Sequence, residues 1–174
     1  MSESVPARDL EAPLVLFLCR GNSATSIMAE ALLRHLAKGQ VRAASAGSVP
    51  IGLVSPYVLE CLREHRIATA GLRSKSWDEF FGVDRPPAHM LINLGDRDAC
   101  AANASWRHDP VPTVKAHWPT PDAEVVFGTA TDKRLAFEEV FVLLEARIRR
   151  FLALPLDRLS DPALSQRLAR IGEV

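Results

Sequence analysis

The residues best suited to chemistry are one cysteine, Cys19, and the short polar segment that follows it. Residues 14–18 are all apolar, which is the pattern of a strand buried on both faces. The polar segment contains glycine, asparagine and serine, which favour tight or left-handed turns. From Ser26 onward apolar residues recur at helical spacing, so the sequence predicts a strand, a loop and a helix. The thiol would therefore face the unpaired N–H groups at the helix N-terminus, where an oxyanion can bind.

This position favours a reactive thiolate at Cys19, because N–H donors and a helix N-terminus lower the pKa of a thiol. The alternative is a structural cysteine buried at a strand end, which is common. Gly21 and Asn22 permit the left-handed geometry that turns successive amides toward one point. An ordinary strand-to-helix turn is the alternative for this loop. The candidate anion-binding residues are Arg20, Gly21, Asn22, Ser23, Ala24, Thr25 and Ser26.

The predicted elements alternate between strands and helices, which implies a parallel sheet flanked by helices. The predicted strands are 14–18, 41–46, 89–94 and 111–116. The predicted helices are 26–38, one opening at Ser55-Pro56, a short one from a capping box at 76–79, one along the apolar stripe 136–152, and one from 160. Residues 82–88 and 119–128 are predicted loops, and 95–107 a short helix or a loop.

Composition and charge exclude several classes of protein. The formal net charge is +0, so the chain offers no basic surface for nucleic acid or an acidic membrane. Three cysteines without paired spacing indicate a reducing compartment, and no apolar run approaches the roughly 20 residues that span a bilayer. The first residues do not read as a secretory signal, so we expect a cytoplasmic protein. No metal is predicted, because His89, His108 and His117 show no ligand spacing, while His35 and His65 are expected at helix surfaces.

The run Cys19-Arg20-Gly21-Asn22-Ser23-Ala24-Thr25-Ser26 resembles the phosphate loop of low-molecular-weight protein tyrosine phosphatases and of the arsenate reductases that share their fold. That loop reads Cys, five residues, Arg, then Ser or Thr. Further segments that resemble the arsenate-reductase branch are 45–47, 71–80, 117–118 and 154–157. The resemblance implies the α/β fold of this family, a four-stranded parallel sheet with helices on both faces. The domain would span 14–174, after a flexible N-terminal tail of residues 1–13.

The resemblance also implies roles for individual residues. Cys19 would attack arsenate or a phosphoryl ester while the loop amides hold the oxyanion, and Ser26 would donate a hydrogen bond to the sulfur. Asp122 aligns with the general acid, which protonates the leaving oxygen; its alternative is an exposed loop residue. Ala123 replaces the usual proline after it, so this loop is less rigid. Ser45 is expected to hydrogen-bond the loop from the neighbouring strand, in a structural role.

The loop departs from the family pattern at Thr25, which stands where the arginine should be. That arginine grips two oxygens of the anion through a planar fork, whereas threonine has one hydroxyl and no charge. Loss of one well-placed transition-state donor costs on the order of 10²–10³ in rate, so we expect weak or altered activity. Without that cation the pKa of Cys19 should be less depressed. Arg20 would lie at the pocket rim, where it either reaches the anion from outside or remains solvated.

The redox cysteines that the resemblance implies are missing. Gly95 stands where the branch has a cysteine after the third strand, and Ala24 where some relatives carry one in the loop. A further cysteine would fall near Asn103. Cys100 matches neither position and, with Cys61, is expected to be inert; a resolving role for Cys100 is the alternative if its segment moves. Arsenate reduction would therefore need an external small-molecule thiol or a glutaredoxin-like partner, with no bound cofactor.

Two hypotheses from different classes follow. The first is a family enzyme of weak or altered activity that acts on phosphate, arsenate or a phosphorylated substrate, and the retained Cys19, Ser26 and Asp122 favour it. The second is a non-catalytic module of the same fold that binds an oxyanion or a protein partner, and Thr25 and Gly95 favour it. A binding module has no evident need for an acid at position 122, so the sequence favours the enzyme.

Overall fold

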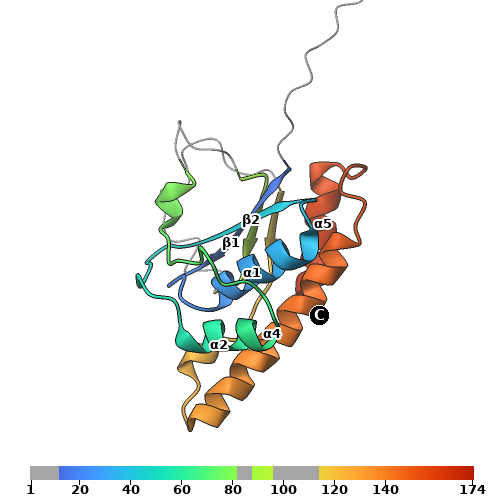
Figure 1. The fold of residues 1–174 in the computed structure, drawn as a ribbon. Coiled ribbons are helices and arrows are strands. Elements are labelled where there is room, and N and C mark those ends of the chain that lie inside the picture. The colour runs from blue at the N-terminus through green and yellow to red at the C-terminus, as the bar shows by residue number, and fades with distance from the viewer. Residues whose placement is uncertain (1–11, 82–87, 96–113) are drawn as a thin grey trace, which may run out of the picture.

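The computed structural model describes residues 12–81, 88–95 and 114–174 (Figure 1). Four strands form one parallel sheet, as predicted, and their order in the sheet is β2-β1-β3-β4. Their bounds are Leu14–Cys19 for β1, Arg42–Gly47 for β2, Met90–Asn93 for β3 and Val114–His117 for β4. Several predictions lie outside the described residues: most of the N-terminal tail, most of the loop at 82–88, the segment 96–113 with Cys100, Asn103 and His108, and the start of the fourth strand.

The predicted helices are present with shifted ends. They are α1 Thr25–Ala37, α2 Pro56–Glu64, α4 Ala130–Leu152 and α5 Asp161–Gly172, with the 3₁₀ turns η1 Trp77–Glu79 and η3 Ala123–Val125. Helix α4 begins six residues before its apolar stripe because Thr129 and Asp132 form a capping box. No capping box forms at η1. There Ser76 Oγ accepts from the Asp78 N–H at 3.2 Å, while the Glu79 carboxylate pairs with Arg73.

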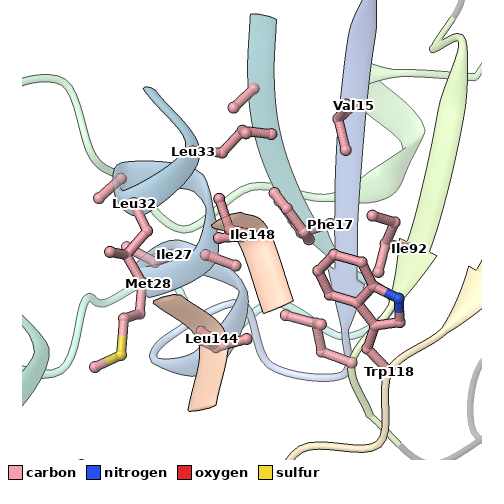
Figure 2. Packing of buried hydrophobic residues seen from close by; sticks show 14 of the residues in the cluster. Val15, Phe17, Ile27, Met28, Leu32, Leu33, Ile92, Trp118, Leu144 and Ile148 are labelled. Carbon is pink, nitrogen blue, oxygen red and sulfur yellow. The ribbon is translucent and has the colours of Figure 1, made fainter. Parts of the chain in front are cut away.

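Both faces of the sheet are buried, which explains the continuous apolar run of β1. Val15 and Phe17 on one face join a large core with α1, α2, α4 and α5 (Figure 2). Leu16 and Leu18 on the other face join a smaller cluster that includes Trp77 of η1. In the described part of the chain, α-helices therefore cover one face and a 3₁₀ turn contributes to the cover of the other. No helix of this part combines the length and apolarity needed to cross a membrane.

The strand order places a binding site at the end of β1. Strand β1 pairs with β2 on one side and with β3 on the other, so successive connections leave it in opposite directions. In open α/β sheets ligands bind at such a switch point, at the carboxyl ends of the strands. Cys19 is the last residue of β1, and the N-terminus of α1 follows it after five residues.

Candidate active site

The loop between β1 and α1 directs its carbonyl groups away from the cavity. The carbonyl oxygens of Cys19, Arg20, Gly21 and Ser23 accept hydrogen bonds from N–H groups within residues 48–55, at 2.8–3.2 Å. The segment after β2 thus holds the loop from outside and occupies these carbonyl groups, while the Asn22 N–H of the same loop donates to the Cys19 sulfur.

Asn22 fixes this geometry. Its φ of 43° is left-handed, as the sequence predicted for this loop. Its buried side chain accepts from the Lys75 N–H at 2.6 Å, and donates to Ser26 Oγ at 2.8 Å and Ser45 Oγ at 2.9 Å. The last contact confirms the predicted role of Ser45. A β-branched or apolar residue could supply neither the backbone conformation nor these three bonds.

The sulfur of Cys19 receives donors from the loop. The Asn22 N–H donates to Sγ at 3.2 Å, and Ser26 Oγ lies 2.9 Å from Sγ. Because Asn22 Nδ2 already donates to Ser26 Oγ, the Ser26 hydroxyl proton is free to point at the sulfur. The predicted contact between Ser26 and this sulfur is therefore present.

The net effect on the thiol is opposite to the expectation from sequence. Burial raises the pKa of Cys19 above its ordinary value, and the hydrogen bonds from Ser26 and from the Asn22 and Gly21 amides only partly offset this. Desolvation penalises the charged thiolate, and the loop supplies no arginine at Thr25 to counter it. At neutral pH the free site thus holds mainly the neutral thiol.

A buried polar network supports the loop from behind. Glu30 is fully buried in α1, where its carboxylate accepts from Ser45 Oγ and from Lys75 Nζ, the latter at 3.1 Å. Lys75 is also buried and donates to the Arg73 carbonyl at 2.8 Å. Arg34 pairs with the other Glu30 oxygen from a half-exposed position. Sequence reasoning missed this network, although Glu30 lies four residues after Ser26 and so shares its helix face.

The predicted loop residues meet at one cavity of about 580 Å³. Its lining includes Cys19, Arg20, Gly21, Ser23, Ala24, Thr25 and Asp122, whereas Asn22 and Ser26 are buried in the loop. Helix α1 begins after Ala24, which makes no side-chain cap, so the first helical N–H groups are not occupied by a capping side chain. Among the described lining residues, Arg20 is the one cationic side chain, and it is exposed.

Two carboxylates also line this cavity. Asp122 is exposed, and its Oδ1 accepts from the Glu124 N–H at 3.0 Å, which caps η3. Glu124, which sequence reasoning missed, accepts a hydrogen bond from Ser23 Oγ at 2.6 Å. Nothing in the sequence distinguishes this glutamate except its place two residues after Asp122. Two acids beside one exposed arginine make the cavity a poor electrostatic match for a doubly charged anion.

Buried Arg147 of α4 anchors the loop that carries these acids. Its guanidinium donates to the Pro119 carbonyl at 2.9 Å and to Thr120 Oγ1 at 3.3 Å. It also donates to the Gly172 and Val174 oxygens at 3.0 and 3.1 Å. Burial lowers the pKa of Arg147. The C-terminal helix and the acid loop are thus held by one side chain.

The position of the missing redox cysteine lies beside the candidate nucleophile. A Cβ atom on Gly95 would lie 3.7 Å from the Cys19 Cα. The backbone therefore still brings the two positions together, but this chain has no side chain there. His117 Nε2 lies 2.8 Å from the Gly95 carbonyl oxygen, and fully buried Trp118 donates to the Leu168 carbonyl.

Fold and site define a class of α/β proteins that hold a cysteine within an amide loop at the carboxyl end of a central parallel strand. The family model for low molecular weight phosphotyrosine protein phosphatases matches residues 14–161. This chain belongs to that family, as the resemblance implied. A comparison with curated protein sequences finds no match.

Solved structures extend this likeness. A thioredoxin-dependent arsenate reductase of Corynebacterium glutamicum is 26% identical with a TM-score of 0.56, and the match covers 82% of this chain and 61% of that one. An arsenate reductase of Archaeoglobus fulgidus is 24% identical with a TM-score of 0.61, over 80% of this chain and 99% of that one. A tyrosine phosphatase of Escherichia coli K30, solved with sulphate, is 18% identical with a TM-score of 0.58, over 81% and 96%. For the Archaeoglobus fulgidus and Escherichia coli structures, which are less than 25% identical to this chain, the likeness concerns the fold alone.

Proposed function

We propose that this protein uses the Cys19 thiolate as a nucleophile on a tetrahedral oxyanion, as an arsenate reductase or phosphatase of weak or altered activity. One observation supports this most strongly: Cys19 lines the cavity, and its sulfur has hydrogen-bond contacts with Ser26 and the Asn22 amide. These donors favour the thiolate over the thiol, and they have no evident purpose around a purely structural cysteine.

The proposed phosphatase step follows from the placement of Cys19 and Asp122 in one cavity. The thiolate would form an S–P bond as the P–O bond to the leaving group breaks, and Asp122 would give its proton to the leaving oxygen. Water would then hydrolyse the phosphocysteine and restore the thiolate. The loop amides would stabilise the charge on the equatorial oxygens.

The proposed reduction of arsenate needs a reductant. Cys19 would form an S–As bond with loss of water, and two electrons from external thiols would then give arsenite and a disulfide. Because positions 24 and 95 carry no thiol, we infer a small-molecule thiol or a glutaredoxin-like protein as the donor. The Corynebacterium glutamicum relative is described as thioredoxin-dependent. The reducing cytoplasm is the compartment that fits this requirement.

A second candidate function has its own support. Glu124 is hydrogen-bonded to Ser23 of the loop, and Thr25 provides no charged fork. Both features weaken the binding of a phosphoryl or arsenyl group. A non-catalytic module of the same fold, which binds an oxyanion weakly or a protein partner, is therefore the alternative.

A comparison of variants separates the two. Hydrolysis of p-nitrophenyl phosphate and thiol-dependent arsenate reduction are measured for the native protein, Cys19→Ser and Thr25→Arg. Thr25→Lys is the matched control, because it restores a charge without the planar fork. We expect Thr25→Arg to raise kcat/KM on the order of 10²–10³-fold, with a smaller gain for Thr25→Lys.

Each outcome is decisive. Native turnover that Cys19→Ser abolishes supports the enzyme, and a large gain in Thr25→Arg identifies the native protein as an impaired member. Native and Thr25→Arg proteins that both bind phosphate without turnover would favour the binding module. If neither binds phosphate or arsenate, both candidate functions fail.

A further inference from the structure

Three side chains of different chemistry converge where α2 packs against α4. Cys61 and His65 lie four residues apart on α2 and its C-cap, and Glu138 reaches them from α4. Cys61 Sγ lies 3.7 Å from Glu138 Oε2, and His65 Nε2 lies 2.9 and 3.0 Å from the two carboxylate oxygens. One ligand atom from each lies within 4.8 Å of the others. None of the three lines the Cys19 cavity.

We propose that Cys61, His65 and Glu138 form a binding site for one zinc ion, with water as the fourth ligand. Thiolate, imidazole and carboxylate are the three ligand types that zinc takes from proteins, and the sulfur disfavours magnesium or calcium. Zinc–ligand bonds of about 2.0–2.3 Å at a tetrahedral centre separate ligand atoms by roughly 3.3–3.7 Å. The sulfur-to-oxygen distance of 3.7 Å already fits, and small rotations of the side chains adjust the others.

The ion would replace protons that now bridge the same three groups. Glu138 accepts a hydrogen bond from the Cys61 thiol and pairs with His65 Nε2. On binding, the thiol proton leaves to solvent and Sγ becomes a thiolate ligand. The proton that His65 Nε2 shares with Glu138 also leaves that atom, so that Nε2 can bind the ion while the neutral imidazole carries its one proton on Nδ1. The Phe141 ring stacks on the His65 ring, with centroids 3.8 Å apart, and so holds Nε2 toward the carboxylate. A ring that is held in place in this way is better prepared to bind a metal ion than a freely rotating one.

The local charge and burial suit a cation. Cys61 is 5% exposed, whereas the His65 and Glu138 side chains are 35% and 42% exposed, so an ion has a path from solvent to a buried sulfur. Burial, with the charges of Glu138, Glu64 and Glu60, raises the pKa of the Cys61 thiol to about 12. The same charges attract a cation, as does the negative end of the α2 dipole at Glu64. Arg134 pairs with Glu60 and offsets part of this charge.

No metal was predicted from the sequence, because His89, His108 and His117 show no ligand spacing and His65 was expected at a helix surface. The third ligand, Glu138, lies 73 residues from His65, so no local pattern connects them. The competing interpretation is a hydrogen-bonded tether that fastens α2 to α4 without an ion. The two differ in one respect that can be measured: only a zinc site requires a thiolate bonded to the metal.

The test uses a full-length Cys19→Ser/Cys100→Ser background, in which Cys61 is the one cysteine left of the three. Chelator-treated protein is titrated with Co²⁺, followed by its absorption spectrum, and the Co²⁺ is then displaced with Zn²⁺. We expect one Co²⁺ per chain, with a sulfur-to-cobalt charge-transfer band and the d–d bands of tetrahedral cobalt. Zn²⁺ should abolish both and raise the melting temperature.

Variants of the ligands are made in the same background. Cys61→Ser should lose the charge-transfer band, and His65→Gln and Glu138→Gln should weaken Zn²⁺ binding at least tenfold. Glu139→Gln, an exposed neighbour on α4, should bind as the background does.

Absence of the charge-transfer band in the background protein would overturn the proposal. Zn²⁺ affinity that is equal in all variants would also overturn it, since it would mean adventitious binding elsewhere. Circular dichroism of each metal-free variant identifies any that fail to fold, and the melting-temperature shift of the background protein then decides alone.

Discussion

Cys19 and Cys61 are two thiols of one chain in opposite hydrogen-bonding environments. The sulfur of Cys19 faces donors, the Asn22 amide and the Ser26 hydroxyl, at the carboxyl end of β1. The sulfur of Cys61 faces an acceptor, the Glu138 carboxylate, between two helices. Burial raises the pKa of both thiols, but only around Cys19 do the neighbouring groups oppose the shift.

Burial alone therefore does not decide whether a cysteine can form a reactive thiolate. Donors stabilise a thiolate, so Cys19 would act as a nucleophile once an additional cation, such as an arginine at position 25, favours ionisation. An acceptor stabilises the thiol, so Cys61 remains protonated unless a metal ion displaces its proton.

In chelator-treated protein Cys61 should be nearly inert to iodoacetamide at pH 7. Its pKa rises from the ordinary 9.0 to about 12, so its thiolate fraction falls by about a thousandfold relative to an unperturbed thiol. Labelling of each cysteine is followed by mass spectrometry, with urea-unfolded protein as the control. Cys61 labelling at the unfolded rate would contradict the assigned environment.

The same shift makes folding stability depend on alkaline pH. The folded state keeps the Cys61 proton that the unfolded chain releases near 9.0, so the unfolded chain binds fewer protons above that pH. The stabilising contribution is fully present below pH 9 and declines as pH rises toward 12. Cys61→Ser should lose this part of the pH dependence in urea denaturation.

Lys75→Met should destabilise the protein by about 3–5 kcal/mol, because it leaves the buried Glu30 carboxylate without its buried cation. Arg34→Met is the matched control: it removes a half-exposed cation from the same carboxylate, and should cost about 1 kcal/mol or less. Urea denaturation measures both free energies of unfolding. Equal losses of unfolding free energy would show that the burial of Lys75 does not strengthen its pairing with Glu30.

Ser26→Ala should slow alkylation of Cys19 roughly ten- to a hundredfold, since a hydrogen bond to a charged group contributes about 1.5–3 kcal/mol. Its loss raises the pKa of Cys19 further. Ser23→Ala is the control within the same loop, because that hydroxyl donates to Glu124 rather than to the sulfur. A change of the same size in Ser23→Ala would remove the special role of Ser26.

Glu124→Gln should tighten phosphate binding by about two- to fivefold, because it removes one negative charge from the cavity at an exposed position. Glu139→Gln, exposed on α4 and outside the cavity lining, should have no effect. Isothermal titration calorimetry at low salt measures the difference. Weaker binding in Glu124→Gln would mean that its contact with Ser23 organises the loop.

Local patterns in the sequence were sufficient to predict the sheet, the main helices and the loop around Cys19. The apolar run before the thiol, the left-handed residue Asn22 and the following helical stripe are all encoded within a few residues of one another. The loop residues and Asp122 were placed at one site because the resemblance aligned them, and the structure brings them to one cavity.

The remaining features depend on contacts between distant parts of the chain. Glu30 and Lys75 are ordinary charged residues in sequence. They become a buried pair only because α1 packs on β2 and the Gly47 N–H at the end of β2 donates to the Lys75 carbonyl. Glu124 reaches Ser23 across 101 residues, and Glu138 reaches His65 across 73. The direction of the Cys19 pKa shift also required the burial of the sulfur, which no local pattern specifies.

Protection of Cys19 from alkylation by a bound oxyanion would show whether the loop amides form an anion site at the sulfur. Iodoacetamide labelling of Cys19 is measured in native and Thr25→Arg proteins, with and without arsenate, and resolved by mass spectrometry. If the loop N–H groups bind an oxyanion beside the sulfur, arsenate should slow labelling of Cys19 at least tenfold and in a saturable manner. Thr25→Arg should reach this protection at a lower arsenate concentration than the native protein. Labelling of Cys19 at the same rate with and without arsenate, in both proteins, would contradict the account.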